Sequence, residues 1–435
     1  MRSLALAASV ARRTAWLLGV VAAAGPVARA APPPSPFQHP ASRAAADAPS
    51  TAAADESQYL FGDWGGLRKQ LSDEGLEFDI LDRWDVLSDV SGGRSTGTSV
   101  RGDFDVIATF DTGKLGLWRG GTFFLFAEDN HGGRITDIHV GGVQNISSLE
   151  ADGFTQLSEY WYQHASADGT TRVRVGRQDA NRDFANSAFA QDFLHSSFGI
   201  LPNVEIPSFP NPQLGASAFV DAAPWFRLKG GVFQGSDARS TFGTDGLFSS
   251  SSVTTSVAAV SLQHALGSES DLEGHSKAGV WYRSGDFDRV TSDGPKERLS
   301  GNYGLYSVFD QRLSRESDDE APVAKRNDQG LRAFLQCGWA PPDRNEIRLY
   351  LGGGVTYIGL VPGRSEDASG FGVANARFSP GVADSIGTSH ETAFELFYKA
   401  QLSHWLFVEP DLQYVLHPGG NENAVVVGFR FSVRF

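Results

Sequence analysis

Apolar and polar residues alternate with a period of two along most of this chain, from about residue 76 to the end. In this first alternating segment Phe78 and Trp84 share one parity. Asp79 and Arg83 share the other. Successive side chains of a β-strand point to opposite faces, so the pattern predicts strands with one apolar and one polar face. A chain that alternates almost throughout is expected to be all-β.

The alternation alone fits both a water-soluble sandwich and a membrane barrel. Three features favour the barrel: alternating segments of ten or more residues, aromatic residues near their ends, and a last segment, "AVVVGFRFSVRF", that closes on Phe435. Strands of ~9 to 11 residues with aromatic girdles and a polar interior are typical of outer-membrane barrels. Beyond the signal-like start, no apolar stretch of about 18 residues predicts a membrane-spanning helix. We therefore predict a transmembrane β-barrel, and expect the barrel-assembly machinery to recognise its last strand.

Chain length sets the expected size of the barrel. Dividing the residues after position 50 by about 24 per strand and connection gives about 16 antiparallel strands, a number that encloses an aqueous channel. A tight turn at Ser403 and His404 and a longer loop at "HPGGNEN" indicate the alternating short and long connections of such barrels. Between about 235 and 300 this alternation is not clear.

The N-terminal residues differ from the rest of the chain. Arginines precede an apolar run from Ala15 to Gly25, and a triplet of small residues ends at Ala30, which is typical of a secretory signal peptide. Pro, Ala and Ser then dominate, with almost no large apolar residue, so this part is expected to be disordered. The predicted domains are a signal peptide at 1–30, a leader at 31–58 and the barrel at 59–435.

Two segments inside the barrel domain depart from the alternation. In "GDWGGLRKQLSDEG", Asp63 can cap a short helix that Gly75 ends in a left-handed conformation. The longer segment, residues 177–219, contains four prolines and many Phe and Leu. Irregular insertions of this length are usually functional. We expect it to fold into the lumen, with apolar residues against the wall and polar residues narrowing the channel; the alternative is an external loop.

Charge and residue types exclude several functions. The net charge of -14 and the lack of a basic patch argue against a nucleic-acid partner. The histidines are scattered and Cys337 is the one cysteine, so neither a metal site nor a cofactor is predicted. Arginine supplies 30 of the 37 basic residues, and its guanidinium suits hydroxyl and carboxylate partners, although coding bias explains the excess equally well.

An enzyme is not predicted either. Neighbouring acids such as Glu128 and Asp129 point to opposite faces of a strand, whereas glycoside hydrolysis needs two carboxyl groups ~5 to 9 Å apart across a cleft. His195 and Ser196 in "FLHSS" could suggest a lipase, but no third member of a triad accompanies them.

The ordered motifs "LFGDWGGLRKQLSDEGLEF", "GRQDANRDFANSAFAQDFLHSSFG", "PSFPNPQLGASAF" and "WAPPDRNEIRLYLGGGVTYIGLVPGR", with the terminal strands, carry a further signal. From about Tyr59 to Phe435 the chain resembles the carbohydrate-selective porins of the OprB type. The resemblance implies a sixteen-stranded barrel of the bacterial outer membrane that passes glucose and related sugars by facilitated diffusion. It also implies an eyelet lined by arginines and acids and formed partly by the inward loop.

A sugar-selective eyelet needs donors and acceptors around a neutral polyol and an aromatic face for its C–H side. The candidates share the lumen-facing parity of several predicted strands or lie at the root of the inward loop: Arg83, Asp85, Glu128, Glu159, Trp161, Arg172, Arg174, Arg177, Asp179, Asn181 and Asp183. The alternative function is a general or anion-selective porin. Expected partners are small sugars, outer-membrane lipid and the assembly machinery, with the chain acting as a monomer or a homotrimer.

Overall fold

The structure is a computed structural model that describes residues 58–235, 253–266, 272–291, 297–316 and 329–435. The predicted signal peptide and all of the predicted leader except Gln58 lie outside these residues. The described residues belong to one compact unit, His39–Phe435. Within them, no helix combines the length and the apolar character needed to cross a membrane.

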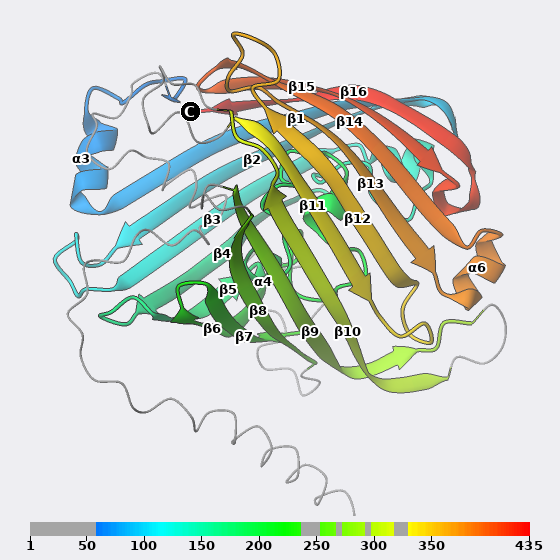
Figure 1. The fold of residues 1–435 in the computed structure, drawn as a ribbon, viewed down its shortest axis with the longest axis horizontal. Helices are drawn as coiled ribbons and strands as arrows, with labels where there is room; N and C mark the ends of the chain where they lie inside the picture. The colour runs from blue at the N-terminus through cyan, green and yellow to red at the C-terminus, as the bar shows by residue number, and fades with distance from the viewer. Residues whose placement is uncertain (1–57, 236–252, 267–271, 292–296, 317–328) are drawn as a thin grey trace, which may run out of the picture. The chain divides into compact units, whose positions relative to one another are not determined.

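Sixteen antiparallel strands close into one barrel in the described part of the chain (Figure 1). Each strand pairs with its neighbours in sequence, and the first strand closes the ring by pairing with the last. The all-β prediction and the estimate of sixteen strands are confirmed. The strands are β1 (Leu76–Gly93), β2 (Gly97–Asp111), β3 (Gly121–Gly132), β4 (Phe154–Ala165), β5 (Thr171–Gln178), β6 (Gln213–Ala223), β7 (Phe226–Gln234), β8 (Thr254–Leu266), β9 (Leu272–Asp288), β10 (Arg298–Arg312), β11 (Gly330–Trp339), β12 (Ile347–Ile358), β13 (Ala368–Phe378), β14 (His390–Ser403), β15 (Leu406–Leu416) and β16 (Glu422–Arg434).

Alternation along the strands separates an apolar outward face from a polar lumen. On β5, Val173 and Val175 are 47% and 56% exposed, whereas Arg174 between them is 9% exposed. The lone cysteine, Cys337, shares the outward parity of Leu335, which is 63% exposed. The period-two pattern therefore assigns side chains correctly to the two faces.

The N-terminal segment is fixed to the seam between β1 and β16. The backbone N–H of Phe435 donates to the Ile80 carbonyl at 2.9 Å, and a guanidinium nitrogen of Arg68 donates to the backbone oxygen of Phe435 at 2.6 Å. Arg68 belongs to α3 (Leu67–Glu74), which lies at the opposite end of the barrel from α6 (Pro380–Ile386) (Figure 1). Gly75 ends α3 with a φ of 102°, as predicted.

Two local predictions need correction. The N-cap of α3 is Gly66, so Asp63 lies outside the helix; its carboxylate still accepts from the Lys69 N–H at 3.0 Å. The tight turn between β14 and β15 is shifted by one residue from its predicted position. Ser403 still pairs with Leu406, which leaves His404 and Trp405 as the turn.

The predicted inward segment is shorter than 177–219, because β5 runs to Gln178 and β6 begins at Gln213. The irregular part, 179–212, carries the short helices α4 (Ala180–Phe184) and α5 (Ser196–Gly199) and folds within the ring of strands (Figure 1). Its Phe193 ring packs 5.4 Å from Phe334 on β11 and 4.9 Å from Phe397 on β14. These contacts across the lumen confirm the inward loop and exclude the external alternative.

A second connection, residues 133–153 between β3 and β4, also folds inward. It contains the π-helix η2 (Thr136–Val140) and contacts the first loop directly, because the Ser148 N–H donates to the Leu194 carbonyl at 2.6 Å. A short 3-10 helix, η3 (Pro418–Gly420), lies in the connection between β15 and β16. Two connections therefore fill part of the lumen, and only the longer one was predicted.

Candidate functional site

Lysines of the barrel wall hold the loop 179–212 in the lumen. Lys229 on β7 donates to the Asp183 carbonyl at 2.5 Å, and Lys277 on β9 donates to the Asn186 carbonyl at 2.6 Å. Lys399 on β14 forms an ion pair of 2.7 Å with Asp192 of the loop. Three strands that are far apart in sequence therefore bind the same loop. Charged donors bonded to loop oxygens fix the backbone of the loop more firmly than neutral donors would.

Acidic wall residues bind the same loop through its N–H groups. Glu395 on β14 accepts from the N–H of Leu194 at 2.6 Å and from the N–H of His195 at 2.9 Å. Asp310 on β10 accepts from Ser187 and, at 2.9 Å, from the Ala188 N–H. The loop backbone is therefore held by both donors and acceptors of the wall.

Burial shifts the pKa values of two loop residues in opposite directions, and both shifts favour the uncharged form. Burial lowers the pKa of His195 to about 3, so this imidazole stays neutral at physiological pH. Burial raises the pKa of Asp179 to about 7, and the nearby Arg182 opposes this rise. Both effects follow from the low polarity of the packed lumen, where an ionised group loses its hydration.

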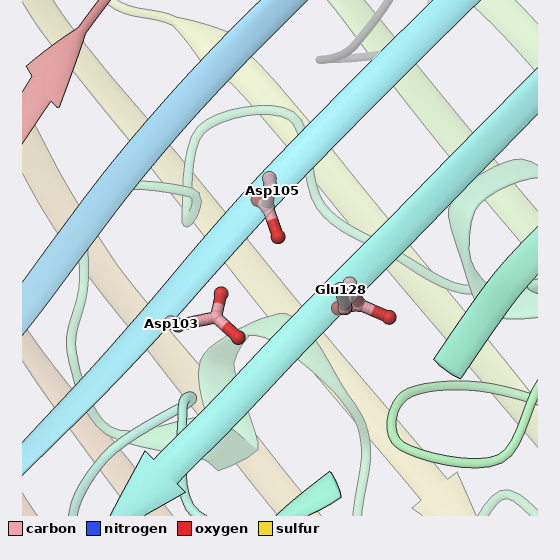
Figure 2. Close-up of side chains that lie close together, drawn as sticks. All are labelled: Asp103, Asp105 and Glu128. Atoms are coloured by element: carbon pink, nitrogen blue, oxygen red, sulfur yellow. The ribbon is translucent and has the colours of Figure 1, made fainter. Parts of the chain in front are cut away.

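Three carboxylates meet on the lumen face of β2 and β3. The side chains of Asp103, Asp105 and Glu128, here called the acidic triad, offer oxygens that lie within 4.8 Å of one another (Figure 2). Such a group could hold a metal ion. Arg83 on β1, however, already places one guanidinium nitrogen 2.5 Å from an oxygen of Asp103 and 2.5 Å from an oxygen of Asp105. The chain thus supplies its own cation to two members of the triad.

A bulge in β4 explains why the candidates Glu159 and Trp161 reach the lumen together with Ser158. The register between β3 and β4 shifts between Phe126 and Ala127, so the alternation of β4 reverses at this point. Ser158 donates to Glu128 of the acidic triad, and Glu159 pairs with Arg182 of α4 at 3.0 Å.

The helix α4 lies between walls of opposite charge. Its Arg182 pairs with Glu159 on the side of the acidic triad. The next residue, Asp183, pairs with Arg174 on β5 at 2.6 Å. Adjacent residues of one short helix thus carry a cation toward the acids and an anion toward the bases.

The bases opposite Asp183 come from β5, β7 and β9. This group, here called the basic wall, consists of Arg172, Arg174, Arg227, Lys229 and Lys277. Arg174 also donates to the Gln163 amide oxygen at 3.0 Å and lies 4.1 Å from the centroid of the Trp161 ring. Arg227 pairs with Asp221 on the neighbouring strand.

Arg172 differs from the other members of the basic wall. Its side chain is half-buried and lies 5.7 Å from the centroid of the Phe219 ring. Among the residues that the structure describes, its guanidinium has no hydrogen-bond partner or ion-pair partner. Its five N–H donors are therefore available to a solute in the lumen.

Three of the four candidates at the root of the loop hold it in place. Arg177 is 1% exposed and donates to the carbonyls of Pro212 at 3.0 Å and Leu157 at 2.7 Å. Asp179 is the N-cap of α4, and Asn181 donates to the Gly199 carbonyl at 2.9 Å. Their side chains position the loop.

Asp85 connects the second inward loop to the wall. Its carboxylate receives two bonds from Arg430 on β16, at 2.7 and 2.8 Å, and one from Ser147 of the loop. On the far side, Glu391 accepts from the N–H groups of Val143 and Gln144, both at 2.8 Å. The loop could have been found in the sequence, because 133–153 interrupts the alternation and carries paired glycines.

Comparison with known proteins gives a consistent result. Residues 95–435 match the family model described as "Carbohydrate-selective porin, OprB family". Porin B of Pseudomonas aeruginosa is 24% identical, over 88% of this chain and 93% of Porin B. Putative porin QuiX of Acinetobacter baylyi is 23% identical, over 88% of this chain and 94% of its own length. The high-pH structure of Pseudomonas putida OprB shares the fold with a TM-score of 0.78 at 22% identity, covering 88% of this chain and 100% of that one.

Proposed function

Because this chain belongs to the OprB family of carbohydrate-selective porins, which places it in the bacterial outer membrane, we propose that it passes monosaccharides such as glucose by facilitated diffusion. Its family consists of channels and not of enzymes. The proposed eyelet lies where the loop 179–212 crosses the lumen. Its lining comes from the predicted residues of the wall and from the charges of α4.

One observation carries this proposal: α4 lies between the acidic triad and the basic wall. Each hydroxyl of a monosaccharide both donates and accepts hydrogen bonds. A site with acceptors on one side and donors on the other can replace part of the water around such a molecule. Many moderate contacts also let the sugar leave again, which a channel requires.

We assign the candidate residues to different roles. Arg172 is the proposed donor to sugar hydroxyls, and Glu128 is a proposed acceptor. Trp161 stacks on Phe124 with ring centroids 4.7 Å apart and also contacts Arg174. We therefore propose that this tryptophan supports the arginine and offers the sugar little free ring surface. The remaining proposed lining residues are Arg83, Asp85, Glu159, Arg174 and Asp183.

A general or anion-selective pore is the second candidate, and the basic wall favours it. Single-channel recordings of the reconstituted protein separate the two. If the pore is sugar-selective, added glucose lowers the conductance and the effect saturates, because bound sugar excludes ions. A conductance that follows only the viscosity of the solution would support the general pore and contradict the sugar channel.

We also propose that the assembly machinery recognises β16, whose outward face carries Val427 and Phe429, 36% and 40% exposed. Phe435 continues this face, and its ring lies 5.5 Å from Phe61. Replacing Phe435 by Ala should lower the amount of folded barrel in the outer membrane without changing single-channel conductance. Unchanged amounts of folded protein would contradict this role.

A further inference from the structure

The arginines of the basic wall differ in whether a carboxylate is bonded to them. Arg174 and Arg227 each have a carboxylate partner. Arg172 has no such partner among the residues that the structure describes.

The members of the basic wall also differ in how their donors are used. Lys229 and Lys277 donate to backbone carbonyls of the loop, which carry no net charge. Arg172 donates to no group among the described residues. A cation with unused donors beside two further cations attracts an anion more strongly than it attracts a neutral molecule.

The register of the wall places these charges around one aromatic ring. Arg172 on β5 is opposite Phe219 on β6, and Phe219 is opposite Lys229 on β7. Arg174 also lies near this ring, 5.4 Å from its centroid. Phe219 thus has cations on both neighbouring strands, and the guanidinium of Arg172 keeps its planar fork of donors open.

We propose that Arg172, with the basic wall around it, binds the carboxylate of sugar acids, that is, polyhydroxylated monocarboxylates that pass through the same channel. A guanidinium can form two parallel bonds to a carboxylate, and such charge-assisted bonds are stronger than bonds to a neutral hydroxyl. The hydroxyls of the same molecule can use the donors and acceptors on either side of α4. This inference rests on the proposed sugar channel, because it extends the substrates of that site.

The test measures solute binding to the full chain in planar bilayers of neutral lipid. Glucose, sodium gluconate and sodium acetate are titrated separately, and the concentration that blocks half of the ion current is compared. For the wild-type chain we expect gluconate to bind at least about tenfold more tightly than glucose or acetate, since it combines a charge with hydroxyls. Equal binding of gluconate and glucose would overturn the proposal. Equal binding of gluconate and acetate would also overturn it, because it would indicate a plain anion site.

Three variants locate the site. Arg172→Gln keeps amide donors but loses the charge, so gluconate should weaken about tenfold and glucose by no more than about threefold. Arg172→Lys keeps the charge and should retain a preference for gluconate. Arg119→Gln is the control, because Arg119 is an exposed residue of the β2–β3 connection, at the same end of the barrel as the β4–β5 turn before Arg172. An equal loss of gluconate binding in this control would overturn the proposal in favour of a long-range field.

The glucose titration also separates this inference from the proposed function. If glucose never blocks the wild-type channel while gluconate does, the neutral-sugar channel is wrong and the carboxylate site stands. If glucose saturates and gluconate does not, the channel stands and this inference is wrong. Heat-modifiable gel mobility of each variant confirms that a folded barrel was measured.

Discussion

The acidic triad and the basic wall face the same loop helix, but their charges are compensated in different ways. Near the triad, Arg83 bonds two carboxylates and Arg182 bonds Glu159. In the basic wall, Arg174 pairs with Asp183, whereas Arg172 has no hydrogen-bond partner among the described residues. A charge bonded to an opposite charge contributes to the fold. A charge with unused donors remains available to a passing solute.

The largest effect should come from removing the cation of the acidic side. Arg83→Met leaves Asp103 and Asp105, which are 1% and 3% exposed, without their shared partner. Breaking a buried ion pair costs about 3 kcal/mol or more of unfolding free energy, and the 30% exposure of the Arg83 side chain favours the lower end. Urea unfolding in lipid vesicles measures the loss. An unchanged midpoint would show that the triad does not depend on Arg83.

A smaller effect, on binding and not on folding, should come from the basic side. Arg172→Ala removes a charged donor worth roughly 1.5 kcal/mol, so glucose binding should weaken about tenfold while the unfolding midpoint stays the same. Arg174→Ala is the comparison variant. Because it also breaks the ion pair with Asp183, it should lower both the glucose affinity and the unfolding midpoint. Loss of stability in the Arg172 variant would contradict the distinction between the two arginines.

The pH dependence of Asp179 tests the acidic side again. An unfolded Asp titrates near pH 4, whereas the folded pKa is about 7. Between these values the unfolded chain has lost a proton that the folded chain keeps, so stability falls as pH rises from about 4 to about 7 and stays lower above that. Between these values we expect the unfolding free energy to fall with a slope that approaches about 1.4 kcal/mol per pH unit. Asp179→Asn keeps the N-cap acceptor and should flatten the curve of urea midpoint against pH; an unchanged slope would assign the effect to other acids.

The smallest effect is expected for a pair outside both groups. Lys69 and Asp73 on α3 form an ion pair of 2.6 Å, but their side chains are 53% and 66% exposed. Exposed pairs of this spacing contribute about 0.3 kcal/mol. Lys69→Ala should therefore leave the urea midpoint nearly unchanged. A loss close to that of Arg83→Met would mean that charge removal alone, without burial, explains both.

The alternation predicted the barrel because the apolar and polar faces of each strand can be recognised from the sequence of that strand alone. The same parity assigned Arg174 and Asp85 to the lumen, and the structure agrees. Parity does not report partners. Lys277 and Asn186 are 91 positions apart, and no local pattern joins them. The bulge at Ser158 was also not predicted, because no particular type of residue marks this register shift in the sequence.

The same limit explains the division of the candidate site. From the sequence, Arg172 and Arg177 were both predicted to line the eyelet, because both are arginines next to the inward segment. The two arginines differ in the use of their donors, because Arg177 donates to the carbonyls of Pro212 and Leu157 and Arg172 does not. Backbone carbonyls are present at every residue, so only the folded arrangement decides which arginine keeps free donors.

The wall residues that bind the inward loop also indicate when, during barrel assembly, the loop becomes fixed. The loop ends at residue 212, whereas Lys229, Lys277, Asp310 and Lys399 all follow it in the chain. The loop cannot be fully held until β14, which carries Lys399, has joined the growing sheet. Contacts between distant parts of a chain form late because closing the intervening segment costs entropy. The part of the lumen that this loop fills is thus completed near the end of assembly, after most of the wall is in place.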